Sequence, residues 1–240
     1  MRKPHRFLSA RKRHQFEQLW QLKMAATDLH NVDAFFKRGA SLDLLELSVF
    51  PRSSVVKEIS ECEALREAAI RYLDADPTDP NIVAICPGDG ASPRLAALLA
   101  FTTHWRCISV DPMLTRWLVK WPDGAATRTA GKVQRLEIIA STCEAAAGQI
   151  KLEPNQRAMV LACHSHAWLD AALAMVAATF PEQIAAVALK CCVDQVITGR
   201  PHDLEYCDDG IFSPKRMVKV WKSLCIGANV DLSIHLRKHD

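Results

Sequence analysis

Short apolar runs alternate with amphipathic segments through the second half of the chain. Runs at residues 83–86, 107–110, 134–140, 158–162 and 184–189 have the length and composition of buried strands. Between them, residues 95–100, 113–121, 143–149 and 168–179 carry apolar positions at helical spacing. This alternation predicts a Rossmann-like, doubly wound α/β fold, in which helices cover both faces of a mostly parallel sheet.

The C-terminal residues depart from this alternation. Ser213 followed by Pro214 is typical of a helix start, which predicts a helix over residues 213–221. Residues 224–226 and 231–236 are then expected to pair as a terminal hairpin. The sheet would thereby gain an antiparallel C-terminal edge.

Before residue 81 the pattern is helical. Residues 9–26, 31–37, 41–50 and 53–73 are predicted as helices, and a run rich in Asp and Pro interrupts the chain at residues 76–80. We therefore expect a basic helical N-terminal extension over residues 1–80 that packs on an α/β core over residues 81–240.

A glycine turn joins the first expected strand to the helix that follows it. Gly88 and Gly90 let the backbone approach a ligand closely, and Ser92 is the expected N-cap of a helix whose free N–H groups can face an anion. Asp111 ends the next strand about twenty residues later, where nucleotide-binding folds place a ribose-binding carboxylate. The stretch therefore predicts a nucleotide-type ligand.

Two common nucleotide motifs do not fit this turn. Pro93 occupies the position of the third glycine in the dinucleotide fingerprint, which argues against NAD and FAD. A Walker-type loop is also excluded, because no Lys-Ser or Lys-Thr pair follows the glycines.

On these residues the chain resembles class I S-adenosylmethionine-dependent methyltransferases. In that family the first strand ends in an acid-x-Gly-x-Gly-x-Gly pattern, and Cys86, Gly88, Gly90 and Ser92 occupy its four positions here. Asp111 matches the acid that holds the ribose hydroxyls. The resemblance covers residues 81–240 and departs from the family twice. Cys86 replaces the acid that helps hold the methionine amino group, and Ser92 replaces the last glycine.

The resemblance implies S-adenosylmethionine as cofactor and assigns a set of residues to it. Ser141 and Thr142, after the third strand, would flank the adenine. The full set that it implies is Cys86, Gly88, Asp89, Gly90, Ser92, Asp111, Met113, Ser141, Thr142 and Cys163.

Cysteines and histidines follow the fourth and fifth expected strands. Cys163, His164 and His166 come after the fourth strand, and Cys191 and Cys192 after the fifth. Because the two strands are neighbours in a doubly wound sheet, both groups should face the ligand edge. The pair resembles a subgroup of methyltransferases, some acting on tRNA, with a His/Cys segment after strand four and Cys-Cys after strand five.

Three interpretations of this cluster compete. His164 or His166 could be the catalytic base, since a neutral imidazole accepts a proton near pH 7. Alternatively His166 could bind zinc together with thiolates. The third interpretation is that the thiols are core residues and the histidines ordinary loop residues. The chain has no Cys-x-x-Cys spacing, so we favour the catalytic histidines and expect no metal. The zinc set would comprise Cys163, His166, Cys191 and Cys192, with Cys207 as a further ligand.

Cations near the same edge are candidate substrate contacts. Lys190 precedes the cysteine pair, and Lys215 and Arg216 follow Pro214. These side chains could meet substrate phosphates or be ordinary surface charges. With Cys191 and Cys192 they form the predicted substrate-binding set.

The net charge is only +3, but the first fourteen residues carry Arg, Lys and His and no acid. This basic start could be an RNA-contacting arm, a mitochondrial presequence or a solvated end without a partner.

No apolar stretch approaches the roughly 20 residues that cross a bilayer, so we expect no membrane partner and a cytoplasmic or, alternatively, mitochondrial protein. The nine cysteines show no regular spacing, which favours free thiols. The oligomeric state is not indicated.

The leading hypothesis is a methyltransferase that moves a methyl group from S-adenosylmethionine to RNA. The alternative is a catalytically inactive methyltransferase-like protein that serves as a binding or assembly module in a ribonucleoprotein. Cys86 and the basic start motivate the alternative.

Overall fold

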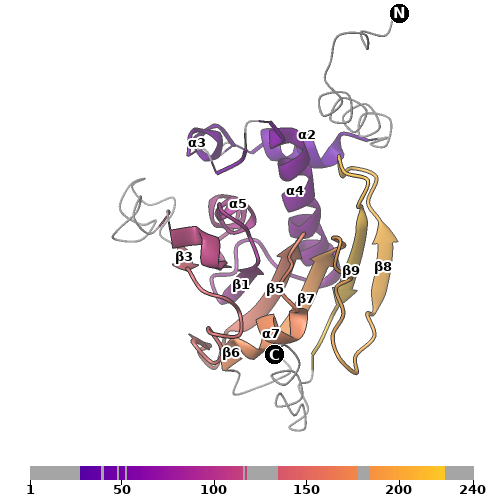
Figure 1. The fold of residues 1–240 in the computed structure, drawn as a ribbon. Coiled ribbons are helices and arrows are strands. Elements are labelled where there is room, and N and C mark those ends of the chain that lie inside the picture. The colour runs from indigo at the N-terminus through magenta and orange to yellow at the C-terminus, as the bar shows by residue number, and fades with distance from the viewer. Residues whose placement is uncertain are drawn as a thin grey trace, which may run out of the picture.

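A computed structural model describes residues 28–38, 41–47, 49–51, 53–115, 117, 135–177 and 184–224 (Figure 1). Its centre is a seven-stranded sheet in the order β3-β2-β1-β5-β7-β9-β8. The strands are β1 (Ile82–Pro87), β2 (Arg106–Val110), β3 (Leu136–Ile139), β5 (Arg157–Cys163), β7 (Ile184–Leu189), β8 (Leu204–Cys207) and β9 (Met217–Trp221). The first five strands in this order, from β3 across the sheet to β7, are parallel to one another, and β9 is antiparallel to both β7 and β8. The predicted Rossmann-like α/β fold is confirmed.

Helices cover both faces of the sheet. They are α2 (His30–Phe36), α3 (Ser41–Glu46), α4 (Val55–Tyr72), α5 (Arg94–Thr102), the 3-10 turn η2 (Pro112–Leu114) and α7 (Leu169–Ala174). The α2, α3, α4 and α5 helices share one apolar cluster with the sheet, whereas α7 belongs to the cluster on the other face. A second, two-stranded parallel sheet joins β4 (Ile150–Lys151) and β6 (Val176–Ala177).

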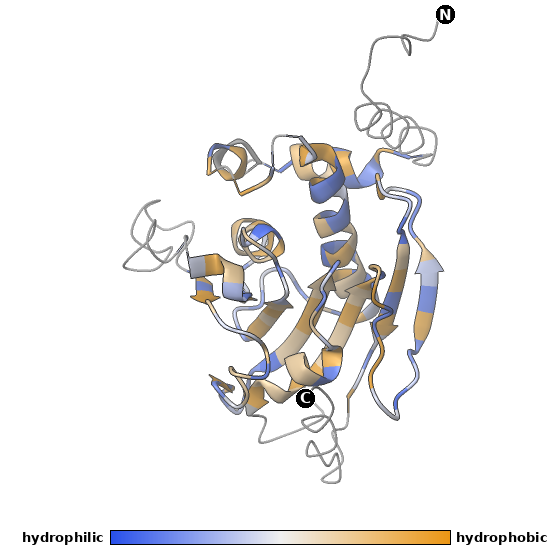
Figure 2. Ribbon diagram, viewed as in Figure 1, coloured by the Kyte–Doolittle hydropathy of each residue, from blue (hydrophilic) through white to orange (hydrophobic). Residues whose placement is uncertain are grey.

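The central strands are apolar on both sides because each side meets a layer of helices. In β1, Ala84 and Cys86 belong to the cluster under α4 and α5, while Val83 and Ile85 belong to the cluster under α7. Apolar residues accordingly line β1, β5 and β7 (Figure 2). Burial on both faces explains why these strands could be recognised as continuous apolar runs.

Helix α4 unites the two helical segments expected within residues 53–73. It packs on α5 and on β5, β7 and β9. Ser54 is its N-cap residue, but its hydroxyl donates to the Glu58 carboxylate (3.4 Å) and does not cap the backbone. The helix lies across the face of the sheet near the carboxyl ends of β5 and β7 (Figure 1).

Two predicted helices were wrong. Residues 213–221 contain β9, because Val218 and Val220 pair with β7 and their side chains enter the core. Residues 143–149 form turns, in which Gly148 adopts φ +68° and donates to the Ala174 carbonyl (2.9 Å). The helix expected over residues 168–179 ends at Ala174, because strand β6 begins at Val176.

The antiparallel edge is confirmed, but β8 and β9 form it. The hairpin predicted from residues 224–226 and 231–236 lies almost wholly outside the described residues, as do the helix over 9–26 and the basic start. Within the described part, no helix is both long and apolar enough to cross a membrane, and the cysteines are free thiols.

Candidate functional site

The strand order creates a switch point between β1 and β5. From β1 the chain continues outward through β2 and β3 and then returns to the opposite side of β1 as β5. In open α/β sheets ligands bind at such a point, outside the carboxyl ends of the strands. Four predicted site residues directly follow the adjacent strands β1, β2, β5 and β7: Gly88, Asp111, His164 and Lys190.

The glycine turn after β1 packs directly against the loop that follows β5. Gly88 and Gly90 have φ of +63° and +79°, a backbone conformation that favours glycine. A Cβ at Gly88 would lie 2.4 Å from the Ser165 hydroxyl oxygen and 3.2 Å from the Ser165 Cα. Only glycine therefore fits at position 88.

Asp111 fixes this turn from the end of β2. Its Oδ2 accepts from the Gly90 N–H (3.0 Å) and its Oδ1 from the Met113 N–H (2.7 Å). Each carboxylate oxygen has a second lone pair, so the group can still accept from ligand hydroxyls. Met113 beside it is largely exposed. Gly88, Gly90, Asp111 and Met113 thus lie together at the carboxyl ends of β1 and β2.

Asp89 has a role that the sequence analysis did not predict. Its carboxylate is buried and accepts from the Leu95 N–H (3.1 Å), the Ala96 N–H (3.3 Å) and the Ser109 hydroxyl (2.9 Å). Asp89 therefore caps α5, and the prediction that Ser92 is the N-cap was wrong, because α5 begins only at Arg94. Burial raises the pKa of Asp89 to about 6, although Arg94 and these hydrogen bonds oppose the increase.

Cys86 and Ser92 lie inward of the turn. Cys86 is buried at the end of β1, and its burial, together with the negative charge of Asp89, holds the pKa of the thiol well above its usual value. Ser92 is also buried. Position 86 therefore presents a neutral thiol where the resemblance places an acid.

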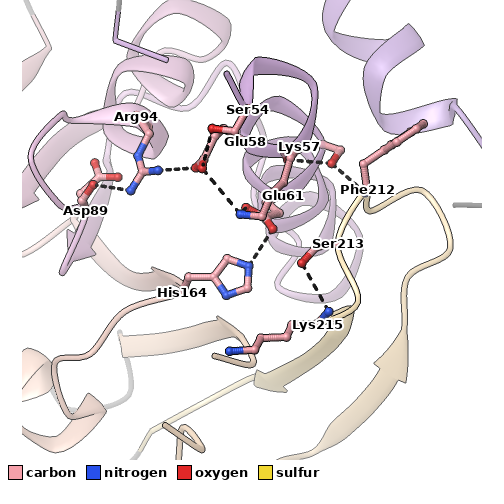
Figure 3. Close-up of polar contacts among 11 residues, drawn as sticks. Ser54, Lys57, Glu58, Glu61, Asp89, Arg94, His164, Phe212, Ser213 and Lys215 are labelled. Carbon is pink, nitrogen blue, oxygen red and sulfur yellow. Dashed lines mark hydrogen bonds and ion pairs between the residues drawn. The ribbon is translucent and has the colours of Figure 1, made fainter. Parts of the chain in front are cut away.

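A cluster of charged and titratable side chains from α4, the start of α5 and the loop after β5 lies at the same edge of the sheet (Figure 3). We name Lys57, Glu58, Glu61, Arg94 and His164 the α4 charge cluster. Glu61 has a fully buried side chain, which lies 2.9 Å from the Lys57 ammonium and 2.7 Å from the His164 Nε2. Glu58 pairs with Arg94 and lies 3.6 Å from Lys57. The sequence analysis missed Lys57, Glu58, Glu61 and Arg94.

Glu61 determines which nitrogen of His164 carries a proton. Burial opposes ionisation of Glu61, but the hydrogen bond and charge of His164, with the charge of Lys57, hold its pKa below the usual value. An ionised carboxylate only accepts, so the His164 Nε2 must donate and Nδ1 becomes the atom that can take a proton. His164 has φ +50°, a strained conformation for a residue other than glycine, which aims its ring at α4.

His166, Cys191 and Cys192 form a second group at this edge. The Cys192 Sγ lies 3.2 Å from the His166 Nε2 and 3.5 Å from the Cys191 Sγ. His166 and Cys192 are exposed and Cys191 is half-buried. The hydrogen bond from Cys191 and the charge of Lys215 lower the pKa of the Cys192 thiol.

The other predicted residues lie around these two groups. Cys163 is half-buried and its thiol hydrogen-bonds to Cys62 of α4. Lys190 lies 4.0 Å from Asp194, and Arg216 pairs with Asp209 at 3.3 Å. Ser141 and Thr142 lie past the end of β3, and Lys215 is exposed near the α4 charge cluster (Figure 3).

Comparison with known proteins gives a likeness of fold only. No protein-family model matches the chain, and no curated protein matches it. Similar solved structures include MtNAS in complex with MTA and tNA, with 13% identity and a TM-score of 0.44 over 88% of this chain and 76% of that one. A mutant of MtNAS in complex with S-adenosylmethionine gives 13% identity and a TM-score of 0.44 over 89% and 76%. At this level the likeness carries no ligand or reaction over to this chain.

Proposed function

We propose that this chain is an S-adenosylmethionine-dependent methyltransferase. The observation that supports it best is the turn of Gly88 and Gly90 at the switch point, which Asp111 holds from the neighbouring strand. The turn leaves backbone open to a ligand, and the acid lies where a ribose would bind. This geometry agrees with the sequence resemblance.

The described residues fit such a cofactor in most positions. The backbone of Gly88 and Gly90 would approach it, Asp111 would accept from the ribose hydroxyls, and Ser141 and Thr142 would flank the adenine. Two positions fit less well: the Asp89 carboxylate already accepts hydrogen bonds from the start of α5, and the Cys86 thiol is neutral and provides no negative charge for the cofactor. The bound cofactor would supply an electrophilic methyl group.

His164 is the proposed catalytic base. Its Nδ1 would accept the proton of the acceptor hydroxyl or amine as that atom takes up the methyl group. Glu61 is a positioning residue, because it fixes the proton on Nε2 and would stabilise the imidazolium that forms. Lys57 holds the second Glu61 oxygen.

RNA is the proposed acceptor. Lys190 and Lys215 are exposed at the same edge, and Trp168, which is 55% exposed, follows the His166 loop. Exposed cations bind phosphates, and an exposed indole can stack on an unpaired base. The acid-free, basic first fourteen residues of the sequence are a further reason to propose a polyanion as acceptor.

Calorimetric titration with S-adenosylmethionine tests the proposal. The wild type should give saturable heat, and Asp111→Ala should raise the Kd about 10- to 100-fold, because hydrogen bonds to a charged group contribute about 1.5–3 kcal/mol. Asp33→Ala, on the exposed side of α2, is the control and should bind like wild type. Absence of heat with folded wild-type protein would overturn the proposal.

The inactive assembly module is the second candidate, favoured by the neutral Cys86. It predicts RNA binding without cofactor heat. Transfer of labelled methyl groups to total RNA by the wild type, at a rate that Asp111→Ala lowers, would exclude it.

Exchange of Glu61 for glutamine should lower kcat about 10- to 100-fold and leave the Kd of the cofactor nearly unchanged. The amide can donate to the His164 Nε2, so the ring loses its fixed tautomer, and the pH profile of kcat should change in shape. Glu67→Gln, on the same helix but half-exposed, is the matched control. An unaltered pH profile in Glu61→Gln would remove His164 as the base.

A further inference from the structure

Two thiols and one imidazole lie close together beyond the ends of β5 and β7. The donor atoms of His166, Cys191 and Cys192 all lie within 4.8 Å of one another. Zn²⁺ binds sulfur at about 2.3 Å and imidazole nitrogen at about 2.0 Å, so tetrahedral angles would separate two sulfurs by about 3.8 Å and sulfur from nitrogen by about 3.5 Å. The observed separations of 3.5 Å and 3.2 Å differ from these by only a few tenths of an ångström.

The two loops that carry these ligands are tied together. Strand pairing sets Cys163 opposite Leu189, so both loops start side by side. Gln195, which is buried, then donates from its side chain to the Ser165 carbonyl at 2.7 Å. Lys219 of β9 holds the Gln195 carbonyl (3.3 Å) and the Asp194 carboxylate (2.9 Å). Residues next to the ligands therefore fix their spacing before any ion arrives.

We propose that His166, Cys191 and Cys192 form a zinc site with three protein ligands and an open fourth position. Two thiolates balance the charge of the ion, and a sulfur and nitrogen donor set selects zinc over hard cations. The exposure of His166 and Cys192 leaves room for water or a substrate atom as the fourth ligand. This proposal does not depend on the binding of S-adenosylmethionine.

The geometry also decides between the possible cysteines. The Cys163 thiol hydrogen-bonds to Cys62 of α4, and Cys207 lies on the edge strand β8. Neither thiol therefore belongs to the group of His166, Cys191 and Cys192. The sequence favoured no metal because it lacks a Cys-x-x-Cys pair. Parallel strand pairing creates instead a site from residues far apart in the chain.

Zinc binding can be measured on full-length protein purified without a histidine tag, reduced and stripped with a chelator. Titration of Zn²⁺ in competition with a chromophoric chelator should show one ion per chain. Cys192→Ser and His166→Ala should each weaken binding by more than about 100-fold, since loss of residues that merely support ligands already costs 10- to 100-fold. Cys207→Ser, another exposed thiol, should bind like wild type.

Cobalt substitution identifies the donors independently. The wild type with Co²⁺ should show thiolate-to-cobalt charge-transfer absorption, which Cys192→Ser should reduce and Cys207→Ser should keep. Circular dichroism of each metal-free variant verifies that it folds. Wild-type protein that binds zinc no better than Cys192→Ser, or that shows no thiolate absorption with Co²⁺, would overturn the zinc site and leave the methyltransferase proposal intact.

Discussion

Exchange of Asp89 for asparagine should remove about 2.5 kcal/mol of pH dependence from the stability of the protein. The folded pKa of Asp89 is about 6, above the ordinary value of 3.8, because burial penalises the charge. Between these two values the folded state binds more protons than the unfolded state. The contribution of Asp89 is therefore most favourable at low pH and is lost as the pH rises through 6.

The difference between the two proteins isolates this group. Other carboxyl groups titrate alike in wild type and Asp89→Asn, so the difference in unfolding free energy should change by about 2.5 kcal/mol between pH 4 and pH 7. The amide oxygen can replace only one carboxylate oxygen, so either the Leu95 or the Ala96 N–H loses its acceptor, and this adds a cost that is constant with pH. Urea unfolding at each pH gives both curves. A difference that stays constant over this range would show that Asp89 titrates normally.

Gly88→Ala should destabilise the protein by about 3 kcal/mol or more. The left-handed conformation costs an alanine about 1–2 kcal/mol, and the new Cβ would collide with Ser165 at 2.4 Å, which adds a penalty of about 1–3 kcal/mol for overpacking. The loop after β5 would have to move, so cofactor heat should also be lost.

Gly148→Ala is the matched control. Gly148 has φ +68°, and a Cβ there would meet no atom within 4 Å. This variant should be destabilised only by the conformational cost, about 1–2 kcal/mol, in the same urea titration. Adding Ser165→Ala to Gly88→Ala removes the worst contact and should recover part of the loss. Equal destabilisation by the two glycine variants would mean that loop contact at Gly88 is unimportant.

The sheet could be predicted from sequence because its strands are apolar on both faces. Residues 83–86 and 184–189 have too few polar positions for anything but a buried element. The helix predicted at 213–221 failed for the opposite reason. Lys219 interrupts an apolar run, yet its stem is buried and its ammonium reaches Asp194.

Two parts of the candidate site could be predicted: the glycine turn, which is local in sequence, and the group of His166, Cys191 and Cys192, whose members follow two neighbouring strands. Gly88, Gly90 and Asp111 belong to one β-loop-α-β unit, and the structure brings them together. The α4 charge cluster depends on contacts between distant segments, and the sequence analysis placed α4 in an N-terminal extension packing on the core without indicating which of its side chains would reach the site. A signal was present: Glu58 and Glu61 precede Leu65 and Ala68 at helical spacing, so acids occupy the apolar stripe of an otherwise amphipathic helix.

These acids also restrict how α4 can dock. A helix that met the sheet through apolar side chains alone could slide by one turn at modest cost, since one aliphatic contact would replace another. Here a shift of one turn would separate Glu61 from His164 and Glu58 from Arg94 and bury carboxylates without partners, at a cost of about 3–5 kcal/mol for a broken buried pair. The charged pairs thus favour a single docking position of α4 on the sheet. A ligand that drew His164 or Arg94 away from these acids would weaken the preference for that position.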